Sequence, residues 1–484
     1  MSGLDKPVRK EEHARRPWRD NIEAVVMAII MAVMLKYFIV EAYQIPTGSM
    51  QPTLMGNDEA GIKDRIIVDK LSFHYRDPER FEVVVFRYPL DRSKNFIKRI
   101  CGMPSEHLKI SLGDLWTRRD ASEPYRVLRR PLPVQQEVWK RIHPSDTRFS
   151  SWKPDPGTSG WTVGGRGAVS ARGTGSVRLP SDGGSVMDSY RDGYPRGVGD
   201  VLSRARGGLG SNPVGDLRFE GEVRALPGCE WVEVHLREGA RRYRFLVPGP
   251  AAPAEERPRI VAEGLPSAAR GEGVVAQGKS AFRLPALEVV SLAAQNMDDL
   301  LTLEVDGEPV VEMEIPEAAD QASCFQIRVE GEGADFSDVE VYRDIFYTED
   351  GKKSEFEIPA GSYVMLGDNT QDSSDSRFWT FVTYDPRGDG QTIRGNDFRP
   401  QNPFVVPGDP EGTRIFLRDE WGDLHDFVAR SGASPSYELA PFVPREMILG
   451  RAVAVFWPTS FTLERWGWWP WWPQLKVVRL QWIH

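Results

Sequence analysis

The spacing of hydrophobic residues predicts two kinds of secondary structure in this chain. Residues 24–35 form an uninterrupted run of apolar side chains, and Lys36 is the only charged residue between Glu23 and Glu41. Many later segments instead alternate apolar and polar residues over short stretches, as strands with one buried face do. The pattern therefore predicts a mainly β protein with a single apolar helix near its N-terminus.

The apolar segment, residues 21–42, is predicted to be a transmembrane anchor. A helix needs about 20 residues, at about 1.5 Å each, to cross a bilayer, and this one reaches that length only if the Lys36 amine extends to the interface. Three arginines precede the segment, at positions 15, 16 and 19. They predict that residues 1–20 are a cytoplasmic tail of an inner-membrane protein, with the rest of the chain outside. A cleaved signal peptide and a buried soluble helix are the alternatives.

The strand pattern predicts a first β domain that is interrupted twice. Its three parts are residues 43–125, 346–382 and 442–484, with strands at 65–69, 82–86, 95–100 and 450–457. Residues 126–345 are predicted to be an inserted, jelly-roll-like β-sandwich, because strand signals recur regularly after residue 217. The Asp306-Gly307 pair predicts a hairpin turn within it. Residues 383–441 are predicted to be a loop-rich insertion.

The C-terminal tail is rich in tryptophan. Six tryptophans lie at positions 466, 468, 469, 471, 472 and 482. Trp favours the membrane–water interface, and the prolines at 470 and 473 exclude a spanning helix, so we expect this tail to rest on the bilayer. An aromatic cluster that packs on the first domain is the alternative.

Charge and cysteine content exclude some classes of function. The 484-residue chain has a formal net charge of −9, which disfavours nucleic-acid binding. Its three cysteines are too few for a disulfide scaffold, and no C-x-x-C pair suggests a zinc or redox site. Cys229 and Cys324 could form a disulfide if their region is exported, or both could be small buried residues.

Candidate chemistry begins at YQIPTGSMQPTLMG, residues 43–56, where two prolines stiffen a loop that presents Ser49. A serine nucleophile needs a base to take its proton. The seven histidines lack a supporting Asp pattern and G-x-S-x-G is absent, so histidine is a poor candidate. Lys98, in NFIKRICGMP, can act as the base if burial makes its amine neutral. In a strand, Lys98 and Arg99 point to opposite faces, so one can be buried while the other stays solvated.

Four stretches resemble the successive sequence motifs of bacterial type I signal peptidases, which are membrane-anchored Ser/Lys endopeptidases. They are YQIPTGSMQPTL, IIVDKLSFHYRDPERFEVVVFRYP, FIKRICGMPSE and YVMLGDNTQDSSDSRFWTFV, in that order. With the anchor and the final strand, the resemblance covers about 160 residues in pieces. Four ordered motifs behind an N-terminal anchor are far more specific than any one of them.

The resemblance implies roles for fourteen residues. It makes Ser49 the nucleophile, Lys98 the general base and the Thr47 hydroxyl an oxyanion-hole donor, and it makes Ser373 the residue that holds the Lys98 amine. The implied substrate-binding residues are Tyr43, Ile45, Pro46, Met50, Leu54 and Ile97. The implied supporting residues are Asp368, Asn369, Asp375 and Arg377.

The chain departs from the family pattern in three places. Residues 370–372 replace a triplet that usually contains arginine, Thr380 replaces a glycine, and residues 104–106 replace a Pro-Gly-Asp turn. These differences bear on the geometry of loops rather than on the reacting groups.

The resemblance predicts an enzyme that removes signal peptides from exported preproteins without a metal or cofactor. Its expected partners are those signal peptides, the lipid bilayer and the secretion machinery. The main alternative is a membrane-tethered protein whose sandwich binds a glycan or a cell-wall component, with a degenerate peptidase frame. A self-cleaving Ser/Lys repressor is disfavoured, because the chain has an anchor and no DNA-binding motif.

Overall fold

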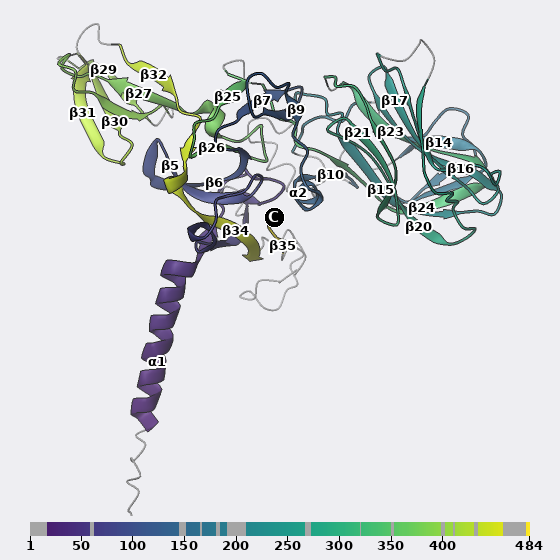
Figure 1. Cartoon of the computed structure of the whole chain (residues 1–484), viewed down its shortest axis with the longest axis horizontal. Coiled ribbons are helices and arrows are strands. Elements are labelled where there is room, and N and C mark those ends of the chain that lie inside the picture. The colour runs from purple at the N-terminus through teal and green to yellow at the C-terminus, as the bar shows by residue number, and fades with distance from the viewer. Residues whose placement is uncertain are drawn as a thin grey trace, which may run out of the picture.

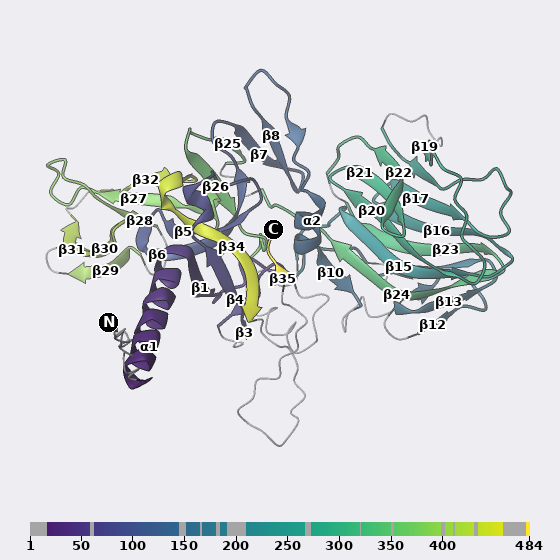
Figure 2. The ribbon, with the colours of Figure 1, turned by 60° about the horizontal axis from the view of Figure 1, so that its bottom comes forward.

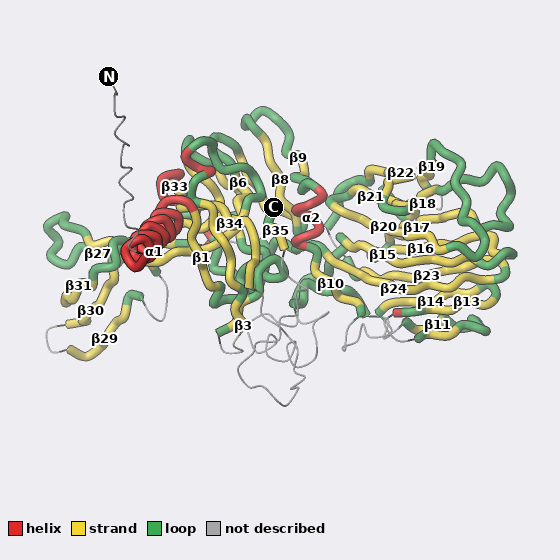
Figure 3. Tube along the Cα trace, turned by 90° about the horizontal axis from the view of Figure 1, so that it is seen from below, coloured by secondary structure: helices red, strands yellow, loops and turns green. Residues whose placement is uncertain are grey.

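A computed structural model of the chain describes residues 17–58, 62–144, 152–164, 167–180, 184–190, 210–266, 273–319, 321–349, 353–397, 402–409, 412–429, 434–457 and 481–484. These residues form a projecting N-terminal helix and three β units (Figure 1). Viewed along the helix, the sandwich domain lies on one side of the central domain and a small β module lies on the other (Figure 3). The mainly β class predicted from the sequence agrees with this architecture.

The projecting helix consists of α1 (Pro17–Met34), which continues into a π-helical segment, Leu35–Ile39. Its large apolar side chains are exposed, among them Val25 at 58% and Met31 at 64%. Within the described part of the chain, no helix meets the length and hydropathy needed to cross a membrane.

The central domain is built on an eight-stranded antiparallel sheet with the order β1-β4-β34-β5-β6-β26-β33, and β35 pairs with β34. Its strands are β1 (Val40–Gln44), β4 (Arg65–Asp69), β5 (Val83–Tyr88), β6 (Asp91–Gly102), β26 (Ser362–Leu366), β33 (Val443–Pro444), β34 (Ile448–Trp457) and β35 (Gln481–Trp482). The four strands expected in this domain coincide with β4, β5, β6 and β34. Segments from both ends of the chain therefore share one sheet.

Two smaller sheets complete the central domain. The four-stranded sheet has the order β25-β7-β8-β9, and β2 pairs with β3. Their bounds are β2 (Gly56–Asn57), β3 (Ile62–Lys63), β7 (His107–Ser111), β8 (Asp114–Arg118), β9 (Arg126–Val127) and β25 (Glu355–Glu357). In the turn before β7, Ser105 has φ 61°, so serine adopts here the left-handed conformation that glycine favours.

The predicted boundary at residue 126 is too early. Residue 126 lies in β9, and the following helix α2 (Leu132–Val138) places Val138 in the core formed by Cys101 and Leu366. The sandwich domain begins only at β10 (Lys140–His143), which pairs with β24. Figure 2 shows α2 between the two domains.

The sandwich domain consists of two antiparallel sheets around a shared hydrophobic core. The first contains β10, β12 (Thr162–Val163), β13 (Val169–Arg172), β15 (Leu217–Ala225), β20 (Val289–Met297), β21 (Leu300–Val305), β22 (Glu308–Glu314) and β24 (Gly333–Arg343). The second contains β11 (Lys153–Pro154), β14 (Gly175–Leu179), β16 (Cys229–Glu238), β17 (Arg241–Pro248), β18 (Arg259–Glu263), β19 (Val274–Gln277) and β23 (Ser323–Gly331).

Local sequence explains two features of the sandwich domain. Asp306 and Gly307 have φ values of 49° and 81° and join β21 to β22, as their hairpin signal predicted. Cys229 and Cys324 are both free. Cys229 pairs with Gly331 at one end of β23, whereas Cys324 lies near its other end, so the two thiols cannot form a disulfide.

The predicted loop-rich insertion is instead a small β module of two three-stranded sheets. One contains β27 (Thr380–Tyr384), β28 (Ile393–Asn396) and β32 (Ser436–Leu439), and the other contains β29 (Phe404–Asp409), β30 (Gly412–Arg418) and β31 (Leu424–Ala429). Val382 and Leu417 are buried in its core. Turns at residues 385–390 and 419–423 are rich in Gly and Asp, and these turn signals concealed the strands between them.

Of the tryptophan-rich tail, only Trp482 belongs to the described residues, where it is 73% exposed on β35. The other five tryptophans lie outside the described residues. Ile483 beside it is buried in the core of the central domain.

Candidate active site

The loop that presents Ser49 lies between β1 and β2 and packs tightly against the chain that follows it. The Leu54 N–H donates to Met50 O at 2.8 Å, which closes a turn directly after Ser49. A Cβ on Gly56 would lie 2.5 Å from Thr47 O, so only glycine allows this close approach. The motif therefore folds into a compact and well-supported loop.

Ser49 and Lys98 meet in a buried site. Lys98 Nζ is hydrogen-bonded to Ser49 Oγ at 2.7 Å. Lys98 is 3% exposed and Ser49 is 8% exposed. Within the described part of the chain, the hydrogen-bond partners of Ser49 Oγ are Lys98 and Thr47, and no histidine is among them. Lys98 is therefore the group placed to exchange a proton with Ser49.

Strand β6 buries both Lys98 and Arg99, so the expectation that one of them stays solvated is wrong. Alternation along the strand sends Lys98 and Ile100 to one face and Arg99 and Cys101 to the other. Ile100 belongs to one hydrophobic core of the central domain and Cys101 to another. Because a core covers each face of this part of β6, neither charged side chain reaches water.

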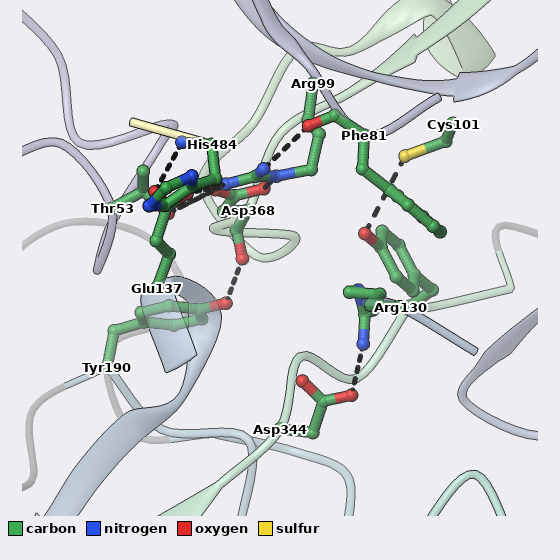
Figure 4. A network of polar contacts seen from close by, with 11 residues as sticks. Thr53, Phe81, Arg99, Cys101, Arg130, Glu137, Tyr190, Asp344, Asp368 and His484 are labelled. Atoms are coloured by element: carbon green, nitrogen blue, oxygen red, sulfur yellow. Dashed lines mark hydrogen bonds and ion pairs between the residues drawn. The ribbon is translucent and has the colours of Figure 1, made fainter. Parts of the chain in front are cut away.

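The positive charge of Arg99 is paired with the carboxylate of Asp368, which lies in the second of the three sequence parts of the central domain. Its Nε and Nη2 donate to the two oxygens of Asp368, each at 2.9 Å, and Nη1 donates to Phe81 O at 2.7 Å (Figure 4). Thr53 Oγ1 also donates to Asp368, at 2.5 Å. Burial alone would lower the pKa of Arg99, but Asp368 raises it, so Arg99 stays charged.

Lys98 lies in a different electrostatic setting from its neighbour. Burial lowers its pKa to about 8, although the negative charges of Asp375, Asp368 and Asp372 oppose this shift. Its hydrogen-bond partner is a neutral hydroxyl rather than a carboxylate. The site therefore makes a substantial fraction of the Lys98 amine neutral near pH 8, while Arg99 keeps its charge.

The loop after β26 clamps the backbone of the Ser49 loop. Asn369 Nδ2 donates to Gly48 O at 3.0 Å, and the Asn369 N–H donates to Ser49 O at 3.1 Å. A Cβ on Gly367 would lie 2.5 Å from Ser49 O, so the two loops are in close contact. Asp368 and Asn369 thus fix β6 and the Ser49 loop relative to each other.

The other supporting residues lie in the same loop. Asp375 and Arg377 form a buried bidentate ion pair with both contacts at 2.8 Å, and Arg377 Nη1 donates to Thr348 O at 2.7 Å. Ser373 is buried, but its hydroxyl has no hydrogen-bond partner among the described residues, so its expected hydrogen bond to Lys98 is not formed. It lies beside Gly367, at the contact with the Ser49 loop.

Some of the remaining expected site residues are accessible at the surface, and the others are buried in the core. Thr47 is exposed, and its Oγ1 lies 3.4 Å from Ser49 Oγ. Pro46 is exposed, and Tyr43 and Ile97 are half-buried, so these three offer surface to a substrate. The other three expected substrate-binding residues are in the hydrophobic core, namely Ile45, Met50 and Leu54. In this structure they support the site from beneath and have almost no accessible surface.

Sequence reasoning missed Arg99 as a partner of Asp368 and missed Thr53 entirely. The charged residue next to Lys98 in an otherwise apolar strand was the available signal for Arg99. Its partner, however, lies 269 positions away in the sequence, so the pairing could not be derived from spacing.

One group of carboxylates has the arrangement of a metal site. Oxygens of Asp114, Asp216 and Asp298 lie within 4.8 Å of one another where the central and sandwich domains meet. None of the expected site residues belongs to this group. An acidic cluster alone does not define a metal site.

Comparison with known proteins identifies the relatives of the central domain. Residues 18–144 and 296–387 match the family model of signal peptidases, peptidase S26. Probable signal peptidase I-2 of Synechocystis sp. is 40% identical over 114 residues, which are 22% of this chain and 49% of that protein. Signal peptidase I of Leptolyngbya laminosa is 32% identical over 116 residues, which are 22% of this chain and 54% of that protein.

These matches have limited extent. The chain spans about half the length of the first curated relatives it matches. The match to galectin LEC-6 of Caenorhabditis elegans covers 26% of this chain and 88% of the galectin, at 11% identity and a TM-score of 0.20.

The matched segments contain all four sequence motifs, including Ser49, Lys98 and the loop from Asp368 to Arg377. The second segment also runs through β21–β24, which belong to the sandwich domain. In these two segments, the chain is similar to the peptidase S26 family of signal peptidases.

Proposed function

We propose that this protein is a membrane-bound serine endopeptidase that removes signal peptides from exported preproteins by a Ser/Lys dyad mechanism. The observation that supports it most is the 2.7 Å contact between the Lys98 amine and the Ser49 hydroxyl in a buried site. A serine becomes a nucleophile when a base takes its proton, and a neutral amine can be that base.

The reaction begins with transfer of the Ser49 proton to neutral Lys98 as Ser49 Oγ bonds to the scissile carbonyl carbon. The Lys98 ammonium then donates this proton to the leaving nitrogen as the carbon–nitrogen bond breaks. The neutral amine next accepts a proton from the water that attacks the acyl-enzyme. That proton returns to Ser49 Oγ when the ester breaks, which restores the starting state.

The negative charge that develops on the carbonyl oxygen needs fixed donors. The Thr47 hydroxyl and the Ser49 N–H are the proposed pair, because both lie on the short loop that presents the nucleophile. Each such donor stabilises the transition state by roughly 3–4 kcal/mol in other enzymes. The clamp from Asn369 to the carbonyls of residues 48 and 49 would hold this loop in place during the reaction.

A signal peptide is proposed to bind extended beside the central sheet. Tyr43, Pro46 and Ile97 supply the exposed apolar surface near Ser49, and small side chains before the cleavage site would fit against it. Ile45 and Met50 would shape this surface from below.

The helix from Pro17 to Ile39 is proposed to anchor the protein in the membrane. At about 1.5 Å per residue, residues 17–39 extend about 35 Å, and the hydrocarbon layer is about 30 Å thick. Its large apolar side chains are exposed, and Figure 1 shows α1 projecting away from the β units. With the N-terminus in the cytoplasm, Ser49 would lie just outside the bilayer surface, where a translocated signal peptide ends.

Removal of either reacting group is expected to abolish cleavage. Ser49→Ala and Lys98→Ala should each lower the rate of preprotein processing by at least about 10³-fold, because the residues act as a unit. The measurement is cleavage of a purified preprotein by purified full-length protein in detergent. Lys153→Ala, which replaces an exposed lysine of the sandwich domain, is the matched control and should cleave like wild type. Wild-type cleavage by Lys98→Ala, with its circular dichroism unchanged, excludes the mechanism.

Activity is expected to rise with pH through about 8. The pKa of Lys98 is lowered to about 8, so the neutral, proton-accepting form is the minority below this pH and the majority above it. The value of kcat/KM should fall about tenfold for each pH unit below 8 and level off above it. A rate that is constant from pH 6 to pH 9 contradicts a lysine base.

Membrane attachment can be tested by truncation. The full chain should remain in the membrane pellet after carbonate extraction, whereas a chain that begins at Val40 should be released. Release of the full chain by carbonate would show that residues 17–39 do not anchor it.

A further inference from the structure

A buried hydroxyl group of the sandwich domain contacts the active-site loop. Tyr190 Oη donates a hydrogen bond to Asp368 O at 2.5 Å, and Tyr190 is 4% exposed. Figure 4 shows this contact on the side of Asp368 opposite Arg99. Tyr190 lies in the long interruption between the two matched segments, so this contact is additional to the matched motifs.

Tyr190 is held firmly by its own domain. The Arg343 guanidinium lies over its ring at 4.7 Å, and Arg343 Nη2 donates to Asp188 O at 3.0 Å and to Ser189 O at 2.8 Å. Arg343 ends strand β24 and is 1% exposed. The backbone that carries Tyr190 is thus tied to a central strand of the sandwich, so the hydroxyl is presented from a rigid support.

The carbonyl that Tyr190 contacts belongs to the residue that connects β6 to the Ser49 loop. The Asp368 side chain accepts from Arg99, the neighbour of Lys98, and the next residue, Asn369, donates to the carbonyls of Gly48 and Ser49. A displacement at this carbonyl would therefore move both partners of the dyad. Proton transfer between Ser49 and Lys98 requires hydrogen-bond distance, so such a displacement would slow the proposed reaction.

A second contact supports the same junction. Arg130, which precedes α2, donates from Nη1 to Asp344 Oδ2 at 2.6 Å, and both side chains are buried (Figure 4). Asp344 follows Arg343 directly. The end of β24 is thus fixed both to the central domain and to the backbone that carries Tyr190.

We infer that Tyr190 is a positioning residue of the active site, and that the sandwich domain is thereby a structural part of it. Among the described residues, Tyr190 is not a hydrogen-bond partner of Ser49 Oγ or Lys98 Nζ, and it acts through the backbone of Asp368 and Asn369. The expected effect of Tyr190 on kcat rests on the proposed function, whereas its effect on the position of the Asp368–Asn369 loop does not.

The test compares Tyr190→Phe with Tyr243→Phe in the full chain. Tyr190→Phe removes one hydroxyl and keeps the ring under Arg343. Tyr243 is also buried in the sandwich, where its hydroxyl donates to Glu238 at 3.0 Å, so Tyr243→Phe removes a comparable group away from the loop. Each variant is measured for hydrogen–deuterium exchange of residues 366–373 and for kcat and KM of preprotein cleavage.

Tyr190→Phe should raise the exchange rate of the loop at least about tenfold, because the Asn369 amide loses its fixed position, and Tyr243→Phe should not. It should lower kcat about tenfold with KM changed less than about twofold, since the substrate surface is untouched. A general loss of stability would affect both variants alike.

Unchanged exchange at residues 366–373 in Tyr190→Phe overturns the inference, whether or not the protein cleaves preproteins. Faster exchange with unchanged kcat also overturns it, because the contact would then be structural only. Absence of cleavage by wild type contradicts the proposed function instead, and the exchange rates still decide whether Tyr190 holds the loop.

Discussion

The hydrogen bond between the Lys98 amine and the Ser49 hydroxyl is the contact on which the proposed Ser/Lys mechanism depends. It is productive only if the amine is uncharged, and burial on β6 is what favours that state. Burial has a cost. Lowering the Lys98 pKa from 10.5 to about 8 costs about 3 kcal/mol of folding free energy below pH 8, where the lysine is protonated in both states, and this cost fades between pH 8 and pH 10.5. The surrounding structure must supply that energy.

The central domain gives the two adjacent basic residues, Lys98 and Arg99, different partners. Arg99 receives a bidentate carboxylate and keeps its charge, while Lys98 receives only a hydroxyl. The Asp368 that neutralises Arg99 also begins the clamp on the Ser49 loop through Asn369. The loop that contains Asp368 and Asn369 therefore both neutralises Arg99 and holds the Ser49 loop in place. A degenerate peptidase frame would not need to keep this arrangement, which disfavours the alternative of a pure binding protein.

The sequence was sufficient to predict the contact between Ser49 and Lys98 and four strands of the central sheet, because both depend on local pattern. Ser49 and Lys98 lie in distinctive motifs, and strands such as β4 are short apolar runs bounded by polar residues. Contacts between distant segments were not predictable, since neither the Arg99–Asp368 pair nor the Tyr190 contact leaves a signal in spacing. The burial of Arg99 was also misjudged. Strand β6 is covered on both faces at this point, so it buries residues that point to either face. The small β module was missed because turn residues dominate its composition.

The central claim is tested most directly by measuring the pKa of Lys98 itself. Nuclear magnetic resonance of protein labelled with ¹³C at lysine Cε, with the Lys98 signal assigned by its loss in Lys98→Met, follows this group across pH 6 to 11. The account predicts a titration near pH 8, clearly separated from the other lysines. A Lys98 signal that titrates near 10.5, with the exposed lysines, would contradict it.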